Sequence, residues 1–537
     1  MHVEFLLLIL SLLFFVSISA DKIGFKFGVP ALLLFLVVGM CFGSHTMTSL
    51  LGLSSIEIKT NTAQALSTIA MCIILFTGGL ETRLSDIKSV LAPGITLATL
   101  GVMLTCAITG VIIYYIFGWL NAVASVSIWL ALLMAATMSS TDSASVFSVL
   151  RTNGIGLKHN LRPLLELESG ANDPMAYVLT TTLISVVLSM DTFVGLTQPI
   201  EALPIIQTIV IQLVMGTVLG FVFGEGLVML MRRVKLGNEA LYPIMILTAC
   251  IFIFSITYYL KGNTYLAVYV GGLIIGNNKF TRKRQTKAFF NGLTWLSQLV
   301  MFLMLGLMVE LKELLNYQVW LPCLIISIVM IGISRPLSVW LCMLPFREYR
   351  QRDKILLSWV GLKGAVPIIF AIMCKAEGIP FADMIFNVVF LCTIVSLLTQ
   401  GTTLTAVARK LNLDTPQKQA HSLEHFDLDL PEEIQSSARE TEVTDKLLAK
   451  GNTLKELSIP PRTLVIMVRR GDDFFVPTGA SELQLGDQLL VISDEDAKAT
   501  YEMMVNDAEE EAQWREDFRR RVRKRCDRMF SWVKKKK

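Results

Sequence analysis

The chain has 537 residues, of which 53% are hydrophobic and only 17% are charged. A soluble globular domain carries about 25% charged residues, so the composition excludes that class and indicates a polytopic membrane protein. The formal net charge of +4 excludes nothing by itself. The nine cysteines and five histidines show no metal-ligand spacing and no disulfide framework. We therefore expect no cofactor and no metal beyond a transported ion.

The first apolar stretch, residues 3–20, is either a transmembrane helix or a secretory signal peptide. We expect a helix, because no Lys or Arg supplies the positive start of a signal peptide. A span needs about 20 mostly apolar residues, and segments of roughly that length recur along the chain. The thirteen candidates are about 3–20, 29–44, 62–80, 90–117, 124–148, 164–190, 203–231, 239–260, 264–278, 290–310, 317–345, 354–374 and 383–407.

The connecting loops are strongly asymmetric in charge. One set of alternate loops holds most of the Lys and Arg residues, and the other holds only Lys59, Lys261, Lys312 and Lys375. The positive-inside rule places the basic loops in the cytoplasm. We therefore expect the N-terminus outside and everything after about residue 408 in the cytoplasm.

Two glycine-rich patterns occur twice in the membrane region. The run 36–44 resembles 270–277, and the run 76–81 resembles 303–310. An odd number of spans separates the matching segments, so the halves would run in opposite senses. Inverted repeats with broken helices are typical of secondary transporters. Short matches among glycine-rich helices also arise by chance, and we favour the repeat.

Several spans contain Gly or Pro near the middle, where lipid tolerates a break only if neighbouring helices or a cavity satisfy the freed backbone. A hydroxyl-rich run, 139–143, interrupts one span, and a glycine-rich run, 361–367, interrupts another. Lys363 in the second run can offset helix-end dipoles where two broken helices cross. Further breaks are expected at Pro93, Pro174 and Pro336.

Two aspartates reach the middle of consecutive antiparallel spans. Asp173 lies some ten residues inside its segment, about 15 Å along a helix, and Asp142 reaches a similar depth. An ionisable group at this depth by default marks an ion path. Oxygen ligands suit a hard monovalent cation, and Ser169 and carbonyls near Thr141 could complete the set. A helix cap is the alternative for Asp142.

Other polar groups in the same region have supporting roles. Asn172 cannot titrate, and its amide can hydrogen-bond an aspartate and fix its orientation. Glu168 would cost several kcal/mol if left unpaired, so we expect an ion pair with Arg335, the one arginine deep inside a span. Glu81, Glu225 and Glu310 lie nearer span ends and are expected at the membrane interface.

At these motifs the sequence resembles the monovalent cation/proton antiporters, in the electroneutral branch marked by an Asn-Asp pair. The resemblance rests on Thr141-Asp142, the run 168–173, Arg335 and the run 361–366, and it covers roughly residues 5–408. It implies that Asp173 binds cation or proton in turn, that Thr141 and Asp142 belong to crossed unwound helices, and that Glu168 and Arg335 form a supporting pair.

Two positions qualify the resemblance. Lys363 stands where many members have Arg, which keeps the charge but loses the planar fork. Pro174, directly after Asp173, resembles the subgroup thought to exchange potassium. We favour K⁺ over Na⁺ and keep Na⁺ as the alternative.

The C-terminal part turns polar, with a linker over 412–440 and a small α+β domain over 441–505. Runs at 454–460, 469–471 and 486–491 resemble the C-terminal domain of regulators of potassium conductance (RCK). Such modules usually dimerise, and the resemblance leaves open a small nucleotide, an ion, or no ligand. The basic tail, 506–537, is expected on anionic lipid; nucleic acid is the alternative.

The sequence thus predicts an all-α membrane domain over 1–411 with about 13 helices, inverted repeats and crossed broken helices. We expect a homodimeric K⁺ or Na⁺/H⁺ antiporter in the plasma membrane of a prokaryote, the inner membrane if Gram-negative, and not an enzyme. A channel would need a selectivity filter of the Thr-Val-Gly-Tyr-Gly kind, which the sequence lacks. An intramembrane aspartyl protease is disfavoured by the residues around Asp142 and Asp173.

Overall fold

The computed structural model describes residues 11–12, 14–19, 31–43, 58–120, 126–192, 202–234, 236–280, 282–416, 438–443, 448, 451–456, 463–471 and 473–493. The chain divides into two compact units, residues 1–417 and 418–537. The expected basic tail and most of the expected linker lie outside the described residues.

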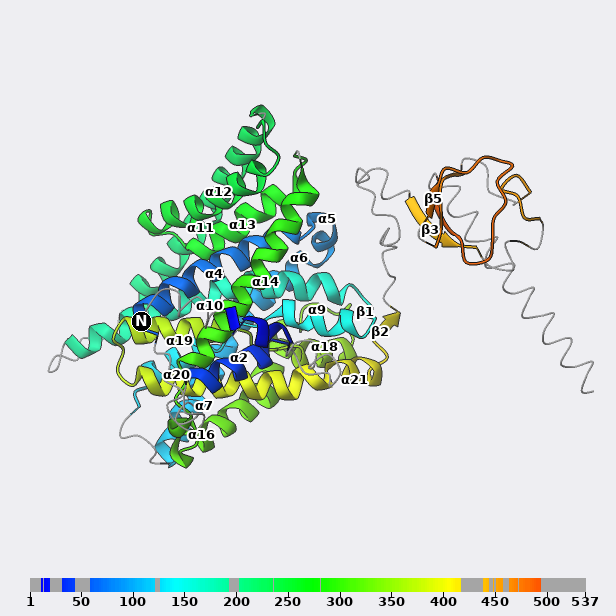
Figure 1. The fold of residues 1–537 in the computed structure, drawn as a ribbon. Coiled ribbons are helices and arrows are strands. Elements are labelled where there is room, and N and C mark those ends of the chain that lie inside the picture. The colour runs from blue at the N-terminus through cyan, green and yellow to red at the C-terminus, as the bar shows by residue number, and fades with distance from the viewer. Residues whose placement is uncertain are drawn as a thin grey trace, which may run out of the picture. The chain divides into compact units, whose positions relative to one another are not determined.

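The first unit is built almost entirely of helices, which confirms the expected helical membrane class (Figure 1). Within the described residues, seven helical stretches are long and apolar enough to cross a bilayer, and four shorter apolar helices accompany them. Thirteen spans therefore stays a prediction. The α-helices are α2 (Ala31–Gly43), α4 (Thr60–Glu81), α5 (Leu84–Ile87), α6 (Leu91–Thr96), α7 (Val102–Leu120), α8 (Ile128–Thr137), α9 (Ser143–Thr152), α10 (Leu161–Thr192), α11 (Ala202–Arg233), α12 (Leu241–Tyr259), α13 (Thr264–Asn277), α14 (Lys283–Leu307), α15 (Leu311–Leu314), α16 (Tyr317–Val329), α17 (Arg335–Cys342), α18 (Gln351–Trp359), α19 (Val366–Ala376), α20 (Ala382–Ser396) and α21 (Thr402–Lys410).

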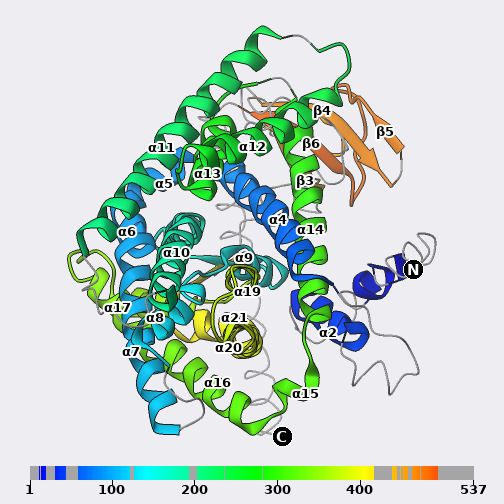
Figure 2. The same ribbon diagram turned by 90° about the vertical axis from the view of Figure 1, so that its left-hand side faces the viewer.

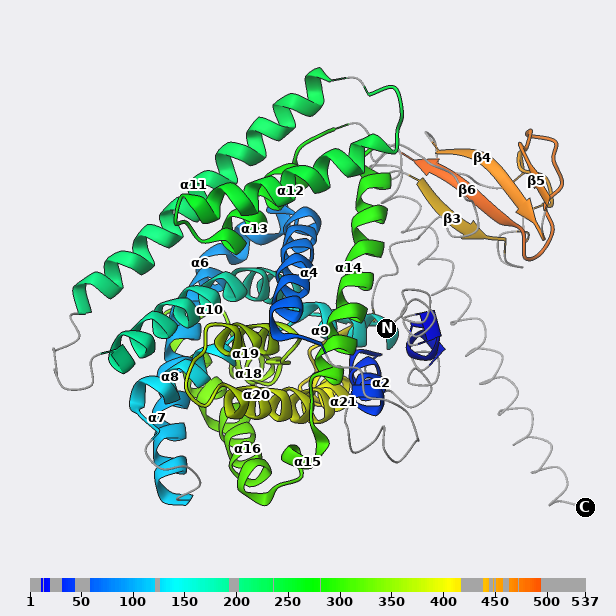
Figure 3. The ribbon, with the colours of Figure 1, turned by 60° about the vertical axis from the view of Figure 1, so that its left-hand side comes forward.

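Two apolar cores organise this unit. One joins α4, α11, α12, α13 and α14, which we call the side layer, through residues such as Phe76, Val228 and Phe290. The larger core holds most of the remaining helices together. Figures 2 and 3 show α11, α12 and α13 running beside the group that contains α8, α10 and α19. Large apolar side chains on α11, including Leu203, Val214 and Phe221, are exposed, as expected of a lipid-facing helix.

The repeated glycine patterns pack crosswise. Helix α2 lies against α14, and α4 lies against α13. A Cβ added at Gly39 would lie 2.2 Å from the Leu303 carbonyl oxygen, and one added at Gly272 would lie 2.3 Å from that of Phe76. Only glycine permits so close an approach of two backbones. A rotation that exchanges the halves converts one contact into the other, as an inverted repeat requires.

Of the five expected mid-span breaks, two are unwound stretches, two are short helices beside irregular helical turns, and one is absent. Residues 138–142 separate α8 from α9, and residues 360–365 separate α18 from α19, without helical structure. Pro336 is the second residue of α17, which directly follows a π-helical turn, η3 (Met330–Ser334). Pro93 stands within the short helix α6, between the 3-10 turn η1 (Lys88–Val90) and the π-helical turn η2 (Leu97–Gly101). The break expected at Pro174 is wrong, because Pro174 lies inside the continuous helix α10.

A small antiparallel ribbon closes the helical unit. Strand β1 (Ile155–Leu157) follows α9 and precedes α10, and it pairs with β2 (Asp414–Pro416). The Lys158 amide also donates to the Leu413 carbonyl at 3.0 Å. A third π-helical turn, η4 (Leu397–Gly401), joins α20 to α21. The ribbon therefore ties the connection between α9 and α10 to the end of the helical unit.

The second unit contains a four-stranded antiparallel sheet in the order β3-β6-β4-β5. Its strands fall close to the apolar runs that the sequence predicts. They are β3 (Ala438–Glu442), β4 (Thr463–Arg470), β5 (Asp473–Phe475) and β6 (Gln488–Ser493). The core contains Val443, Val465, Val468, Leu483 and Leu489.

Candidate functional site

The two unwound stretches are residues 138–142, which we call the first stretch, and residues 360–365, the second stretch. They meet through their backbones at a point that we call the crossing. The Asp142 amide donates to the Leu362 carbonyl oxygen at 2.8 Å. The Lys363 ammonium donates to the Ser140 carbonyl oxygen at 2.9 Å and is buried. Because Ser140 lies just beyond the end of α8, the ammonium stands where the helix-end dipole is negative. This is the crossing position expected for Lys363.

Side chains from α20 and η4 support the second stretch. The Lys363 amide donates to Ser396 Oγ at 3.0 Å, and Ser396 donates to Gln400 Oε1 at 2.6 Å. The Gln400 amide in turn donates to the Trp359 carbonyl at 2.9 Å, at the end of α18. These bonds satisfy backbone groups that would otherwise be unpaired in the membrane.

One face of α10 supplies hydrogen-bond partners to the first stretch. The Asp173 carboxylate accepts a 2.5 Å hydrogen bond from the Ser140 hydroxyl. Ser169 donates to the Thr141 carbonyl at 2.8 Å and accepts from the Ser143 amide at 2.9 Å. Both Asp173 and Ser169 are buried. The predicted residues Thr141, Ser169 and Asp173 therefore come together at the crossing, and Ser140, which the predicted site omitted, completes them.

Asn172 has a different partner from the one expected. Its amide nitrogen donates to Thr141 Oγ1 at 2.5 Å, whereas the sequence predicted a hydrogen bond to an aspartate. Its amide oxygen is buried and has no hydrogen-bond partner among the residues that the structure describes. An acceptor in that condition remains available for a cation or a water molecule.

Asp142 both caps a helix and packs into the crossing. Its carboxylate accepts from the Ser145 hydroxyl at 2.5 Å and from the Ser145 amide at 3.2 Å, at the start of α9. A Cβ added at Gly364 would lie 2.6 Å from Asp142 Oδ2, so the carboxylate lies directly against the second stretch. Asp142 therefore caps α9, which is the alternative role that the sequence suggested. Its carboxylate also lies at the crossing, beside Gly364.

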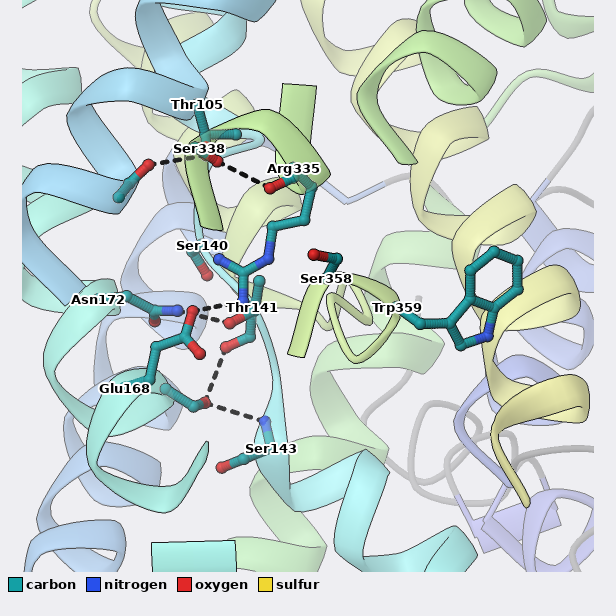
Figure 4. A network of polar contacts seen from close by, with 12 residues as sticks. Thr105, Ser140, Thr141, Ser143, Glu168, Asn172, Arg335, Ser338, Ser358 and Trp359 are labelled. Atoms are coloured by element: carbon teal, nitrogen blue, oxygen red, sulfur yellow. Dashed lines mark hydrogen bonds and ion pairs between the residues drawn. The ribbon is translucent and has the colours of Figure 1, made fainter. Parts of the chain in front are cut away.

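Glu168 and Arg335 form the expected ion pair (Figure 4). Both side chains are at most 5% exposed. Arg335 follows the π-helical turn η3, and turns of this kind often occur at functional sites. The Ser338 hydroxyl, one turn further along α17, donates to the Arg335 carbonyl at 3.0 Å and is hydrogen-bonded to Thr105 Oγ1 at 2.7 Å. The pair is therefore buried among polar side chains, and Arg335 Nε has no hydrogen-bond partner among the residues that the structure describes.

The three glutamates expected at the membrane interface lie at or near helix ends. Glu81 is the exposed last residue of α4, Glu310 directly precedes α15, and Glu225 stands about two turns before the end of α11.

Two unwound stretches that cross beside a buried carboxylate on a neighbouring helix are typical of secondary transporters. Comparison with known proteins gives the family. The profile described as "Sodium/hydrogen exchanger, transmembrane" matches residues 8–410, and that of the TrkA-C domain matches residues 440–504. The chain belongs to the sodium/hydrogen exchanger family and carries a C-terminal TrkA-C domain.

Individual relatives agree with the family. The chain is 38% identical over 415 residues to the K(+)/H(+) antiporter NhaP of Alkalimonas amylolytica, covering 77% of this chain and 68% of that protein. It is 35% identical over 490 residues to the K(+)/H(+) antiporter NhaP2 of Shewanella sp. (strain ANA-3), covering 91% and 81%. The fold resembles that of the sodium proton antiporter MjNhaP1 from Methanocaldococcus jannaschii at pH 8, with a TM-score of 0.64, 20% identity, and coverage of 76% and 99%.

Proposed function

We propose that the chain exchanges K⁺ for H⁺ by alternating access, with Asp173 as the exchanging group. The observation that carries the proposal is the Ser140–Asp173 hydrogen bond of 2.5 Å at the crossing of the two unwound stretches. It holds one buried carboxylate against freed backbone oxygens, the ligand type that hard cations prefer.

Competition at one carboxylate couples the two fluxes. When Asp173 is ionised, it binds the cation together with the Ser140 hydroxyl, the open amide oxygen of Asn172 and the Asp142 carboxylate. When Asp173 is protonated, its negative charge is gone and the cation leaves. Because the group carries a cation or a proton and never both, each cycle exchanges one charge for one charge, and transport is electroneutral.

The other polar groups keep the crossing in shape. The Lys363 side chain donates a hydrogen bond to the Ser140 carbonyl beyond the end of α8, and Thr141 and Ser169 hold the first stretch in its unwound form. The Glu168–Arg335 pair supports α10 from behind without joining the exchange. These roles need no cofactor and no chemical step.

K⁺ is favoured over Na⁺ by three observations. The two relatives above are named K(+)/H(+) antiporters, the C-terminal unit matches the TrkA-C profile, and Pro174 directly follows Asp173. Na⁺ as the cation, with the same mechanism, is the second candidate. We further propose a homodimer in a prokaryotic plasma membrane, with the N-terminus outside and the C-terminal domain in the cytoplasm. That domain would dimerise or bind a small nucleotide or ion.

The test uses everted vesicles that contain the full chain and a pH-sensitive dye. After respiration has acidified the interior, K⁺ and Na⁺ are added in turn, and the proposal expects dequenching that is larger with K⁺. Larger dequenching with Na⁺ would favour the second candidate, equal dequenching would show that the exchanger does not select between the two cations, and no dequenching with either cation would overturn exchange. The variant Asp142→Asn keeps a good helix cap, so a loss of apparent cation affinity in it would assign Asp142 to binding.

A further inference from the structure

Asn263 joins the side layer to the helix that carries Asp173. Its amide oxygen accepts from the Leu266 amide at 3.0 Å and caps α13, while its amide nitrogen donates to the Pro174 carbonyl at 2.8 Å. Its backbone amide donates to the Gln212 carbonyl of α11 at 3.0 Å. The side chain is fully buried. One residue therefore fixes the tip of α13, a helix of the side layer, to the residue after Asp173.

Aromatic rings extend this contact along α10. Tyr177, one turn beyond Asp173, meets Tyr265 of α13 edge to face, with 4.7 Å between ring centroids. Tyr177 also lies 6.2 Å from the ring of Phe370 on α19, and Tyr265 lies 5.4 Å from that of Phe254 on α12. Because α10 and α19 belong to the site whereas α12 and α13 belong to the side layer, these rings bridge the two helix groups.

The opposite side of Asp173, toward β1, is less closed. Asp142, Ser143, Gly170 and Ala171 are partly exposed, although they lie in the middle of the bundle. Residues 172–176 of α10 are all buried. The half-helices α9 and α18 pack mainly against α10, α17, α21 and β1, whereas α19 packs on α4 of the side layer. The structure thus holds the site closed where Asn263 and the rings lie.

We propose that Asn263 is a positioning residue that latches this closed side. Its hydrogen bond to the Pro174 carbonyl holds α10 against α13 while the site is open toward β1. This bond breaks when the site opens on the side where Asn263 lies. In the proposed orientation, the latched side is the outer face of the membrane. The inference rests on the proposed alternating access.

The latch can be removed without removing the cap. Asn263→Ser still caps α13, but its side chain is too short to reach the Pro174 carbonyl. The reporter is Thr180→Cys, because Thr180 is seven residues beyond Asp173 on the same helical face and is fully buried. A membrane-impermeant maleimide is added to right-side-out vesicles, and labelling of the chain without Thr180→Cys is subtracted.

Asn277 provides a matched control at the other end of α13. Its amide nitrogen donates to the Thr82 carbonyl at 2.8 Å, and its oxygen accepts from the Leu84 amide at 2.8 Å. This bridge joins α13 to the end of α4, inside the side layer. Asn277→Ser should therefore leave the labelling of Thr180→Cys unchanged.

The latch predicts that Asn263→Ser raises the labelling rate by about two- to tenfold, the range that one lost neutral hydrogen bond produces in a two-state equilibrium. The apparent cation affinity from the everted side should weaken, since fewer chains face that side. A rate equal to that of the Asn277→Ser control would overturn the latch. If Asn263→Ser does not reach the membrane, Asn263→Thr carries the same test. Absent exchange in the wild type would overturn the proposed function and leave the labelling comparison valid.

Discussion

The Lys363 ammonium lies 2.9 Å from the carbonyl oxygen of Ser140, the residue whose hydroxyl holds Asp173. One broken helix therefore supplies a positive charge to the end of the other, at the residue next to the exchanging carboxylate. Without Lys363, the Ser140 carbonyl would lose this hydrogen-bond donor.

Replacing Lys363 by Met should lower the maximal exchange rate at least tenfold. The substitution leaves the Ser140 carbonyl without its donor and removes the basic side chain at the crossing. The measurement is the rate of cation-induced dequenching at saturating K⁺. Lys375→Met is the control. Lys375 lies on α19, the helix that follows the second stretch, but it forms a partly exposed ion pair with Asp383. Unaltered exchange in Lys363→Met would contradict the role given to this charge.

Replacing Glu168 by Gln should destabilise the chain by about 3–5 kcal/mol, because Arg335 would remain buried without its counter-ion. The expected sign is a lower midpoint of thermal unfolding in detergent. Replacing both partners, in the double variant Glu168→Gln/Arg335→Met, should recover part of the lost stability. The exposed pair Glu239–Arg282 is the control, and Glu239→Gln should cost at most about 1 kcal/mol. Equal costs at the two pairs would count against a buried supporting pair.

Replacing Gly364 by Ala should impair exchange more than stability. The new methyl group would stand 2.6 Å from the Asp142 carboxylate, so either the carboxylate or the second stretch must move. Overpacking of this kind costs about 1–3 kcal/mol. Gly292→Ala in α14 is the control, because a Cβ there meets nothing within 4 Å. The measurement compares the initial exchange rates of Gly364→Ala and Gly292→Ala at matched expression. Equal rates would contradict the prediction and show that Asp142 can move away from the crossing.

The C-terminal unit should lose stability in acid through one ion pair. Asp487 is buried, which disfavours its charge, but hydrogen bonds from Arg470 at 2.9 and 2.7 Å and from the Gln484 amide outweigh burial and hold the pKa of Asp487 below its usual value. The stabilisation is therefore present above the ordinary pKa of 3.8 and is lost as the pH falls through the lower folded pKa.

Hydrogen exchange of residues 463–493 in the full chain, followed against pH, measures this loss. The wild type should lose protection as the pH falls below about 4. Asp487→Asn should be less protected at neutral pH and should show a smaller change in acid. A variant with the same pH profile as the wild type would show that the pair does not set acid stability.

Much of the site followed from the sequence because lipid makes buried charge costly. Asp173 and Glu168 could be placed at depth by counting along the helix, and the one deep arginine, Arg335, was the available partner for Glu168. The unwound runs were visible as clusters of hydroxyls and glycines. Those inferences need only position along the chain, and position is what a sequence records.

Contacts between distant segments were harder to predict. Asn172 bonds Thr141 rather than an aspartate, because the turn of α10 points its amide at the first stretch. Pro174 lies inside α10 without ending it, and its carbonyl accepts a hydrogen bond from Asn263. Ser396 and Gln400 gave a weak signal, two polar residues four apart in an apolar span. Asn263 looked like a loop residue before α13, and only packing reveals its partner.

The most direct test of the account is cation-induced dequenching in everted vesicles that carry Asp173→Asn. Asparagine keeps the size of the side chain and can still bond Ser140, but it can neither take up a proton nor carry the charge that binds the cation. Asp383→Asn, at an exposed aspartate of α20, is the control for expression and vesicle integrity. The account predicts no K⁺- or Na⁺-dependent proton movement in Asp173→Asn and normal movement in the control. Movement in Asp173→Asn above that of vesicles without the protein would contradict it.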